Sequence, residues 1–177
     1  GNTTQDVTLD VNPIAASALG YGSVVSTIYT EDFASTVPTA LPAGWAKAAV
    51  SGSNPDWLTY ETTRHPSGQP PHSSPNLVYF NSYNVSSGGS ARLYRTSGLD
   101  MTASGGQTLS FWMYHDNGYS NSNDRVQPQV STDGGATWAD VGGAVSRYDG
   151  SVGWKQHSVS LGAYRWETDL RLGLLGI

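Results

Sequence analysis

The octapeptide STDGGATW, residues 131–138, places an acidic Gly-Gly turn directly between two apolar runs. The side chain of Asp133 can hydrogen-bond the backbone two residues further on, and Gly134 and Gly135 adopt positive φ without steric cost. The flanking residues 126–130 and 138–141 have the composition of β-strands. The stretch therefore predicts a β-hairpin, with Trp138 as an aromatic in the core or at its rim.

The composition extends this prediction to the rest of the chain. Charged residues make up 13% of the 177 residues, against about 25% in globular domains, and the chain has 21 Gly, 6 Trp and 10 Tyr. Segments with a helical spacing of apolar residues are interrupted by Gly or Pro. We therefore expect an all-β protein, in which many short strands joined by polar turns form two packed antiparallel sheets.

The alternation of apolar and polar residues gives the approximate position of each strand. Residues 5–11 alternate with period two and are followed by small residues and a Pro, so residues 1–26 are predicted to be an N-terminal strand and a flexible linker. Residues 27–177 are predicted to be the sandwich domain. Its strands are expected at residues 27–33, 45–50, 57–61, 76–81, 91–95, 107–115, 125–131, 137–141, 154–161 and 169–175.

Charge and apolar content exclude two classes of partner. The net charge is −5 and no cluster of Lys and Arg is present, whereas a nucleic-acid-binding surface needs such a cluster to neutralise phosphates. No run approaches the roughly 20 apolar residues of a membrane-spanning helix. Since the chain has no Cys, few Lys and many Ser, Thr and Asn, we expect an extracellular or cell-surface protein.

Four motifs, in this order, resemble the MAM-like jelly rolls, a group that includes the choice-of-anchor J and cleaved-adhesin-type domains of secreted bacterial proteins. The motifs are EDF with LPAGW (31–45), LSFWMYH (109–115), DRV leading into STDGGATW (124–138), and GWK continuing to Leu161 and Tyr164. The octapeptide is also similar to the Asp-box of secreted carbohydrate-active proteins, although a single copy is not a propeller. The resemblance implies a jelly-roll sandwich over residues 27–177.

The chain ends at Gly176-Ile177, before the final strand that the resemblance implies. A jelly roll without this strand has an open sheet edge. The N-terminal strand, with Val7, Leu9 and Val11 on one face, is a candidate to fill the gap in its own domain or, by strand exchange, in another copy. The alternative is an ordinary first strand of its own domain.

Two groups of oxygen-bearing side chains are candidate ligands of a structural Ca²⁺. The loop at residues 115–124 is rich in them and includes Asp116, Asn117 and Asp124. The family resemblance implies a second location, near the acidic first strand at Glu31 and Asp32. The alternative is that these side chains cap turns or lie on a solvated edge.

Surplus aromatic residues point to ligand binding rather than to catalysis. The sequence contains no Gly-x-Ser-x-Gly elbow, no His-Glu-x-x-His motif and no focused group of carboxylates, so we expect no enzyme. Trp57, Tyr83, Tyr119 and Trp166 are candidates for stacking on sugar rings or contacting a protein, although aromatics that alternate along strands also fill cores.

The sequence thus predicts a non-catalytic, extracellular adhesion or recognition module of a larger secreted protein, which binds carbohydrate or protein. The alternative is a structural subunit of an extracellular filament or surface assembly that binds copies of itself by exchanging its N-terminal strand.

Overall fold

The computed structural model describes residues 3–11, 26–102 and 107–177, and for residues 3–11 and Ser26 it describes the backbone and its pairing. In these residues the chain forms strands and two short turns of 3-10 helix, η1 (Ser82–Asn84) and η2 (Gly162–Tyr164), and no α-helix. None of the described helical segments is long and apolar enough to cross a membrane. The predicted linker, at residues 12–25, lies outside the described residues.

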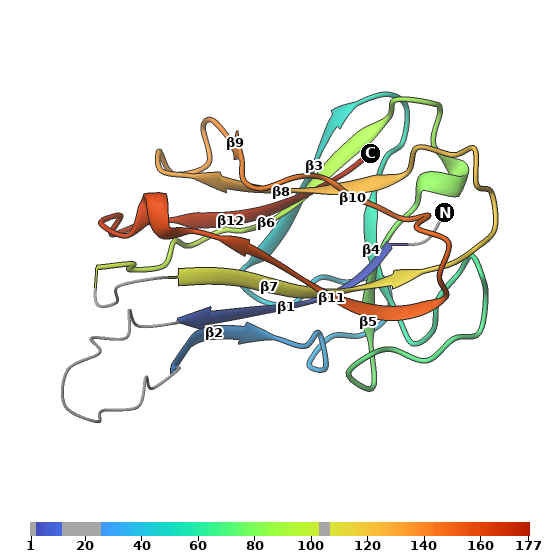
Figure 1. Ribbon diagram of the computed structural model, residues 1–177, viewed down its shortest axis with the longest axis horizontal. Helices are drawn as coiled ribbons and strands as arrows, with labels where there is room; N and C mark the ends of the chain where they lie inside the picture. Colours follow the sequence, from blue (N-terminus) through green and yellow to red (C-terminus); the bar gives the residue numbers. More distant parts are fainter. Residues whose placement is uncertain (1–2, 12–25, 103–106) are drawn as a thin grey trace.

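The strands pair antiparallel in two six-stranded sheets that pack against each other (Figure 1). The first sheet consists of β1 (Thr3–Val11), β2 (Ser26–Glu31), β4 (Trp57–Tyr60), β5 (Leu77–Phe80), β7 (Gln107–His115) and β11 (Gly153–Ser160). The second consists of β3 (Trp45–Ser51), β6 (Ser90–Arg95), β8 (Arg125–Ser131), β9 (Ala139–Asp140), β10 (Val145–Ser146) and β12 (Arg171–Gly176). The predicted all-β, two-sheet antiparallel sandwich is therefore confirmed, whereas the jelly-roll connectivity stays a prediction.

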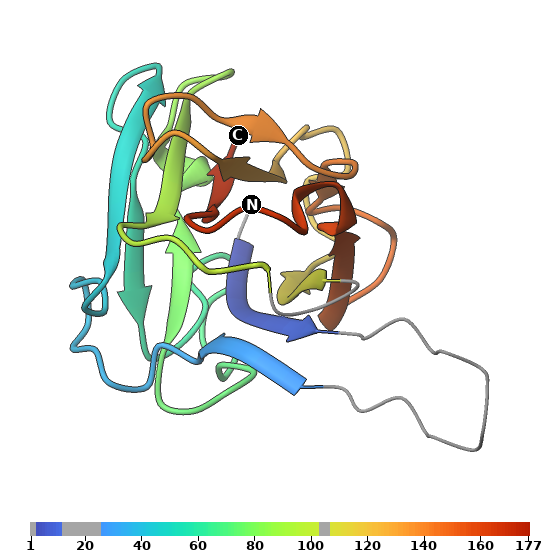
Figure 2. The same cartoon turned by 90° about the vertical axis from the view of Figure 1, so that its left-hand side faces the viewer.

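The order of strands in the first sheet is β11-β7-β1-β5-β4, with β2 also paired to β1, so the N-terminal strand lies in the interior of the sheet. β7 pairs along one side of β1, while β5 and β2 share the other side (Figure 2). The side chains of Val7, Leu9 and Val11 lie outside the described residues. Their backbone register places Val7 opposite Phe111 and Leu9 opposite Leu109. β1 thus pairs within its own chain, in the interior of the first sheet and not at an open edge.

The second sheet has the order β10-β8-β12-β6-β3, with β9 paired to β8, and the core lies between the two sheets. On β7, Leu109, Phe111 and Met113 belong to the core, whereas Trp112 is half-buried on the outer face. Trp57 is also fully buried, where its ring packs against Phe80 at 5.4 Å between ring centroids. The prediction that one of Phe111 and Trp112 lies between the sheets is therefore confirmed, with Phe111 as the buried residue.

The octapeptide at residues 131–138 forms the turn between β8 and β9. Gly134 and Gly135 have φ of +74° and +91°, and Asp133 accepts hydrogen bonds from Thr137 and Ser131, which lower the pKa of Asp133 to about 2. Trp138 is half-buried on the outer face of the second sheet, where it crosses Gly173 so closely that a Cβ there would approach its ring to 2.6 Å. The motif fixes a turn and attaches it to β12.

The predicted strand boundaries agree best where the alternation is longest. β7 and β8 begin and end at the predicted residues, 107–115 and 125–131. The strand predicted at residues 137–141 is reduced to β9, because the turn continues through Trp138. β10, with two residues, was not predicted because it is too short to show a period.

Substituting Phe111 with Ala tests the position of the core. Phe111 is completely buried, so we expect Phe111→Ala to lower the free energy of unfolding by about 3–5 kcal/mol. Trp112→Ala is the matched control on the same strand, and we expect a smaller loss because the Trp112 ring is half-buried on the outer face. Chemical denaturation of both variants is the measurement, and a larger loss for Trp112→Ala would contradict the assignment of faces.

Candidate functional site

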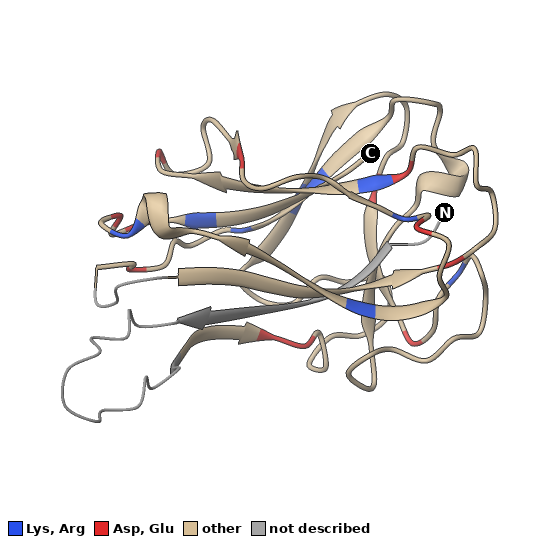
Figure 3. Cartoon of the chain, in the orientation of Figure 1, with Lys and Arg blue, Asp and Glu red and all other residues tan. Residues whose placement is uncertain are grey.

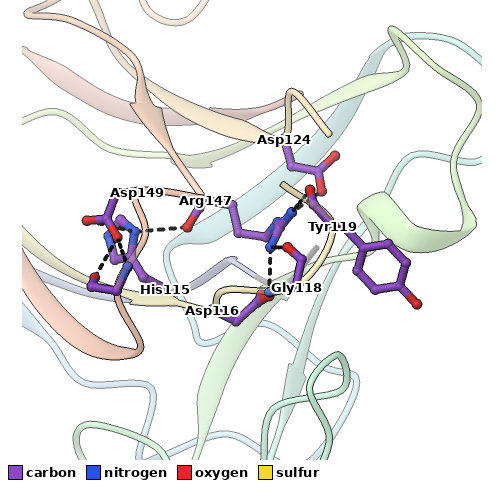
Figure 4. Close-up of polar contacts among 8 residues, drawn as sticks. His115, Asp116, Gly118, Tyr119, Asp124, Arg147 and Asp149 are labelled. Carbon is purple, nitrogen blue, oxygen red and sulfur yellow. Dashed lines mark hydrogen bonds and ion pairs between the residues drawn. The ribbon is translucent and has the colours of Figure 1, made fainter. Parts of the chain in front are cut away.

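Arg147, directly after β10, is completely buried and joins its own segment to the loop between β7 and β8 at one end of the sandwich (Figure 4). Its Nη1 donates to Asp116 Oδ1 at 2.7 Å, and its Nε donates to Asp124 Oδ2 at 3.2 Å. Nη1 and Nη2 also donate to the backbone carbonyls of Gly118 and Tyr119, each at 2.8 Å. Because a buried charge is tolerated only when it is paired and hydrogen-bonded, this arrangement fixes the shape of the loop between β7 and β8.

The loop presents the side chain of Tyr119, which is 66% exposed, from a backbone in the left-handed region with φ of +51°. This conformation is strained for a residue with a large side chain, and it persists only where the surroundings hold it. Here the carbonyl of Tyr119 accepts from Arg147, while Gly118 N donates to Asp116 Oδ1 at 2.8 Å. The same buried guanidinium therefore holds both the loop and the strained residue at its tip.

Three aromatic rings from three different loops form a ridge beside this tip. The His65 ring stacks on Tyr83 with 4.1 Å between centroids and 18° between planes, and Tyr83 meets Tyr119 edge to face at 6.2 Å. Tyr83, in η1, is 52% exposed. The His65-Tyr83-Tyr119 ridge thus keeps two large tyrosine rings in contact with solvent.

A groove lies on each side of this ridge. The first groove, of about 460 Å³, is lined by His65, Pro66, Gln69, Tyr114, Asp116, Asn117, Gly118, Tyr119 and Val152. The second, of about 450 Å³, is lined by Ser82, Tyr83, Val85, Ser87, Tyr119, Asn121, Ser122, Asn123 and Asp124. Both volumes fall within the roughly 300–1,000 Å³ that is typical of ligand sites. Apart from the ridge, the linings consist mainly of hydroxyl, amide and small side chains.

One wall of the first groove, formed by His65, Pro66 and Gln69, belongs to the Pro-rich loop between β4 and β5, which packs against the outer face of the first sheet. His72 stacks on Trp112 at 4.0 Å between centroids and lies edge to face with Trp154 at 5.9 Å. Trp154 Nε1 donates to the carbonyl of Pro70 at 3.1 Å. The two tryptophans therefore anchor this loop to the sheet, and the loop in turn positions His65 in the ridge.

Two imidazoles, His115 on β7 and His157 on β11, meet at 2.9 Å between their Nε2 atoms. His115 Nδ1 donates to the carbonyl of Arg147 at 2.9 Å, so in the neutral pair His115 Nε2 accepts the proton of His157 Nε2. Burial is the largest cause that lowers the pKa of both imidazoles. For His157, the charge of the neighbouring His115 is the second cause, and it lowers the pKa further.

Asp149 and Lys155 complete the surroundings of the histidine pair. Asp149 Oδ2 lies 3.5 Å from His115 Nδ1 and accepts from Lys155 Nζ at 2.7 Å. Although burial opposes ionisation, hydrogen bonds from Lys155 and Ser151 hold the pKa of Asp149 below its ordinary value. The pair therefore faces one carboxylate and two cations, Lys155 and Arg147.

The structure divides the four predicted ligand-binding aromatics. Tyr83 and Tyr119 come together in the ridge, as described. The prediction for Trp57 is wrong, because its side chain is fully buried and its Nε1 donates to the carbonyl of Ala91. Trp166 is 71% exposed but follows η2, at the other end of the sandwich from η1 (Figure 1), and the guanidinium of Arg165 lies 5.3 Å from its ring centroid.

The predicted calcium ligands are engaged in contacts within the chain. Asp116 and Asp124 face the guanidinium of Arg147, and Asn117 lines the first groove. Glu31 accepts from the backbone of Phe33, and Asp32 accepts from the backbone of Ala34. Within residues 27–102 and 107–177, no group of three or more His, Asp or Glu side chains gathers in a way that could hold a metal ion. Calcium binding stays a prediction.

The sequence analysis did not identify Arg147, which holds the loop of Tyr119, or His65, which stacks on Tyr83 in the ridge. Both contact side chains far along the chain: Arg147 pairs with Asp116 across 31 residues, and His65 stacks on Tyr83. The only local indication was the richness of residues 115–124 in polar oxygens, which was interpreted as a metal site. Asp116 and Asp124 both pair with the buried guanidinium of Arg147.

No protein-family model matches the chain, and a search of curated proteins finds no similar sequence. The resemblance to MAM-like jelly rolls therefore stays a prediction that rests on the sequence motifs.

Removing the guanidinium tests its structural role. We expect Arg147→Met to lower the free energy of unfolding by about 3–5 kcal/mol, because it leaves two carboxylates and two carbonyls without their donor. Arg165→Met is the matched control at an exposed position, and we expect it to stay within about 0.5 kcal/mol of the parent protein. Urea denaturation is the measurement, and equal effects of the two substitutions would contradict the role of Arg147.

The histidine pair makes stability depend on pH with a defined sign. In the folded state the pKa values of His115 and His157 lie below the 6.5 of a free imidazole, so the unfolded chain binds more protons. Their contribution to stability is therefore complete above about pH 6.5 and is lost as the pH falls below it. Urea denaturation between about pH 7.5 and about pH 5.5 should show this decline, with a shallower slope for His157→Gln. Stability that rises on acidification would contradict the assignment.

Proposed function

We propose that the protein is a non-catalytic recognition module that binds carbohydrate through the His65-Tyr83-Tyr119 ridge and its flanking grooves. The observation that carries this proposal is the pair of solvent-exposed tyrosine rings that the Arg147 network holds in place. Together with the expectations from the composition, this observation supports an extracellular or cell-surface adhesion module that forms part of a larger secreted protein.

The chemistry of the ridge and grooves suits sugars. Tyrosine gives a flat apolar face with a hydroxyl at its edge, and it has few rotatable bonds to immobilise on binding. The adjoining grooves supply hydroxyl and amide groups, including those of Ser87 and Asn117. Such groups can both donate hydrogen bonds to sugar hydroxyls and accept them. Since strained backbone tends to occur at functional positions, the conformation of Tyr119 also supports a role for its ring.

The carboxylates support binding over hydrolysis. A glycosidase uses two carboxyl groups that flank the scissile bond. Asp116 and Asp124, which line different grooves, both accept hydrogen bonds from Arg147. In this arrangement they position the loop, so the proposal assigns them no catalytic role.

One observation favours a second candidate function, a structural subunit that exchanges its N-terminal strand between copies. β1 fills a slot between β7 on one side and β2 and β5 on the other, so a β1 from another copy would make the same backbone pairs. The solution mass at high protein concentration separates the two functions. A monomer supports the recognition module, and oligomers that are lost when residues 1–11 are deleted support the subunit.

The ridge predicts the effect of removing its rings. We expect Tyr119→Ala and Tyr83→Ala each to weaken carbohydrate binding about tenfold or more, a loss of about 1.4 kcal/mol, measured by calorimetry with a ligand found on a glycan array. Tyr119→Gly should weaken binding equally without lowering the melting temperature, because glycine adopts positive φ freely.

Trp166→Ala is the matched control, since it removes an equally exposed aromatic ring near η2. It should leave the affinity unchanged. If Trp166→Ala abolishes binding while both tyrosine variants bind normally, the ridge is not the binding site.

A further inference from the structure

The two grooves adjoin the same aromatic ridge. Tyr119 lines both of them, and Tyr83 lines the second groove while it stacks on His65, which lines the first. A ligand that lies in one groove is therefore in reach of the ridge and of the other groove. The grooves have similar volumes, about 460 and 450 Å³, so each is large enough to hold part of a ligand.

Charge in the grooves is compensated within the protein. The acidic and basic side chains that line them are Asp116, Asp124 and His65. Both carboxylates are paired with Arg147, and burial lowers the pKa of His65, which favours its neutral form. Acidic and basic residues are scattered around this end of the described chain (Figure 3). An ionised ligand would lose water here without gaining an unpaired counter-charge, which is unfavourable, whereas a neutral ligand meets no such cost.

The polar groups of the grooves are instead neutral and exposed. Asn117 and Gln69 line the first groove, and Ser87, Asn121 and Ser122 line the second. They are distributed on both sides of the ridge, so a ligand that uses all of them must extend across it.

We propose that the two grooves are consecutive subsites for one uncharged, linear oligosaccharide that crosses the Tyr83-Tyr119 rings. The ligand is then an internal stretch of a neutral polysaccharide rather than a single terminal sugar. This inference rests on the proposed function. Its physical basis is that a chain held in one groove binds the other intramolecularly, at a high effective concentration, so affinity grows with chain length until both grooves are filled.

The test is calorimetric titration of the full chain with neutral gluco-, xylo- and manno-oligosaccharides of two, four and six sugars. For the preferred backbone we expect the affinity to rise about tenfold or more from two to six sugars. Asn117→Lys and Ser87→Lys each place a long side chain in one groove. Each variant should bind six sugars no more tightly than the parent protein binds two.

Thr168→Lys is the matched control, because it adds the same side chain at an exposed position between η2 and β12. It should keep the full dependence on chain length. Circular dichroism of all three variants verifies that each is folded. The dependence of affinity on oligosaccharide length is also measured with the parent protein alone, so that result does not depend on any variant.

The outcomes separate this inference from the function on which it rests. Equal affinity for two, four and six sugars, with binding still weakened by Tyr119→Ala, would overturn the two-subsite inference and leave the recognition function intact. Tighter binding of oligogalacturonate than of every neutral oligosaccharide would overturn the uncharged ligand. If no oligosaccharide of any length binds, the proposed function fails together with the inference.

Discussion

The buried guanidinium of Arg147 is the interaction on which the candidate site depends. A fully buried cation must find its partners inside the protein, and Arg147 finds them in two carboxylates and two backbone carbonyls of the loop between β7 and β8. Its own carbonyl accepts from His115, which links the loop to the first sheet. Tyr119 keeps its left-handed backbone because this network surrounds it. Without the guanidinium, neither the position of the tyrosine ring nor the division into two grooves would be defined.

The sandwich brings the parts of the site together at one end. The loops that follow β4, β5, β7 and β10 supply His65, Tyr83, Tyr119 and Arg147, respectively. β1 contributes indirectly, since it joins β7 to β5 within the first sheet and so holds the strands that carry two of these loops at a fixed spacing. The rigid sheets thus position loops that need little regular structure of their own, which is a common arrangement for binding sites.

The sequence predicted features that depend on local pattern, and it could not predict those that depend on distant pairing. The turn at Asp133 and the boundaries of β7 and β8 follow from neighbouring residues, and Tyr83 and Tyr119 were identified as surplus aromatic residues. Trp57 carried the same kind of signal, but it alternates inward on β4 and is buried. Asp116 and Asp124 were identified as charged oxygens that need a cation, and their partner is 31 and 23 residues away, where no local pattern indicates it.

The most direct test of this account is NMR titration of the isotope-labelled protein with a neutral oligosaccharide of six sugars. We expect the largest changes in the signals of residues 65–69, 82–87 and 116–124, on both sides of the Tyr83 and Tyr119 rings, while those of residues 162–168 stay unchanged. Changes confined to residues 162–168, or to the outer faces of the sheets, would contradict the assignment of the binding face.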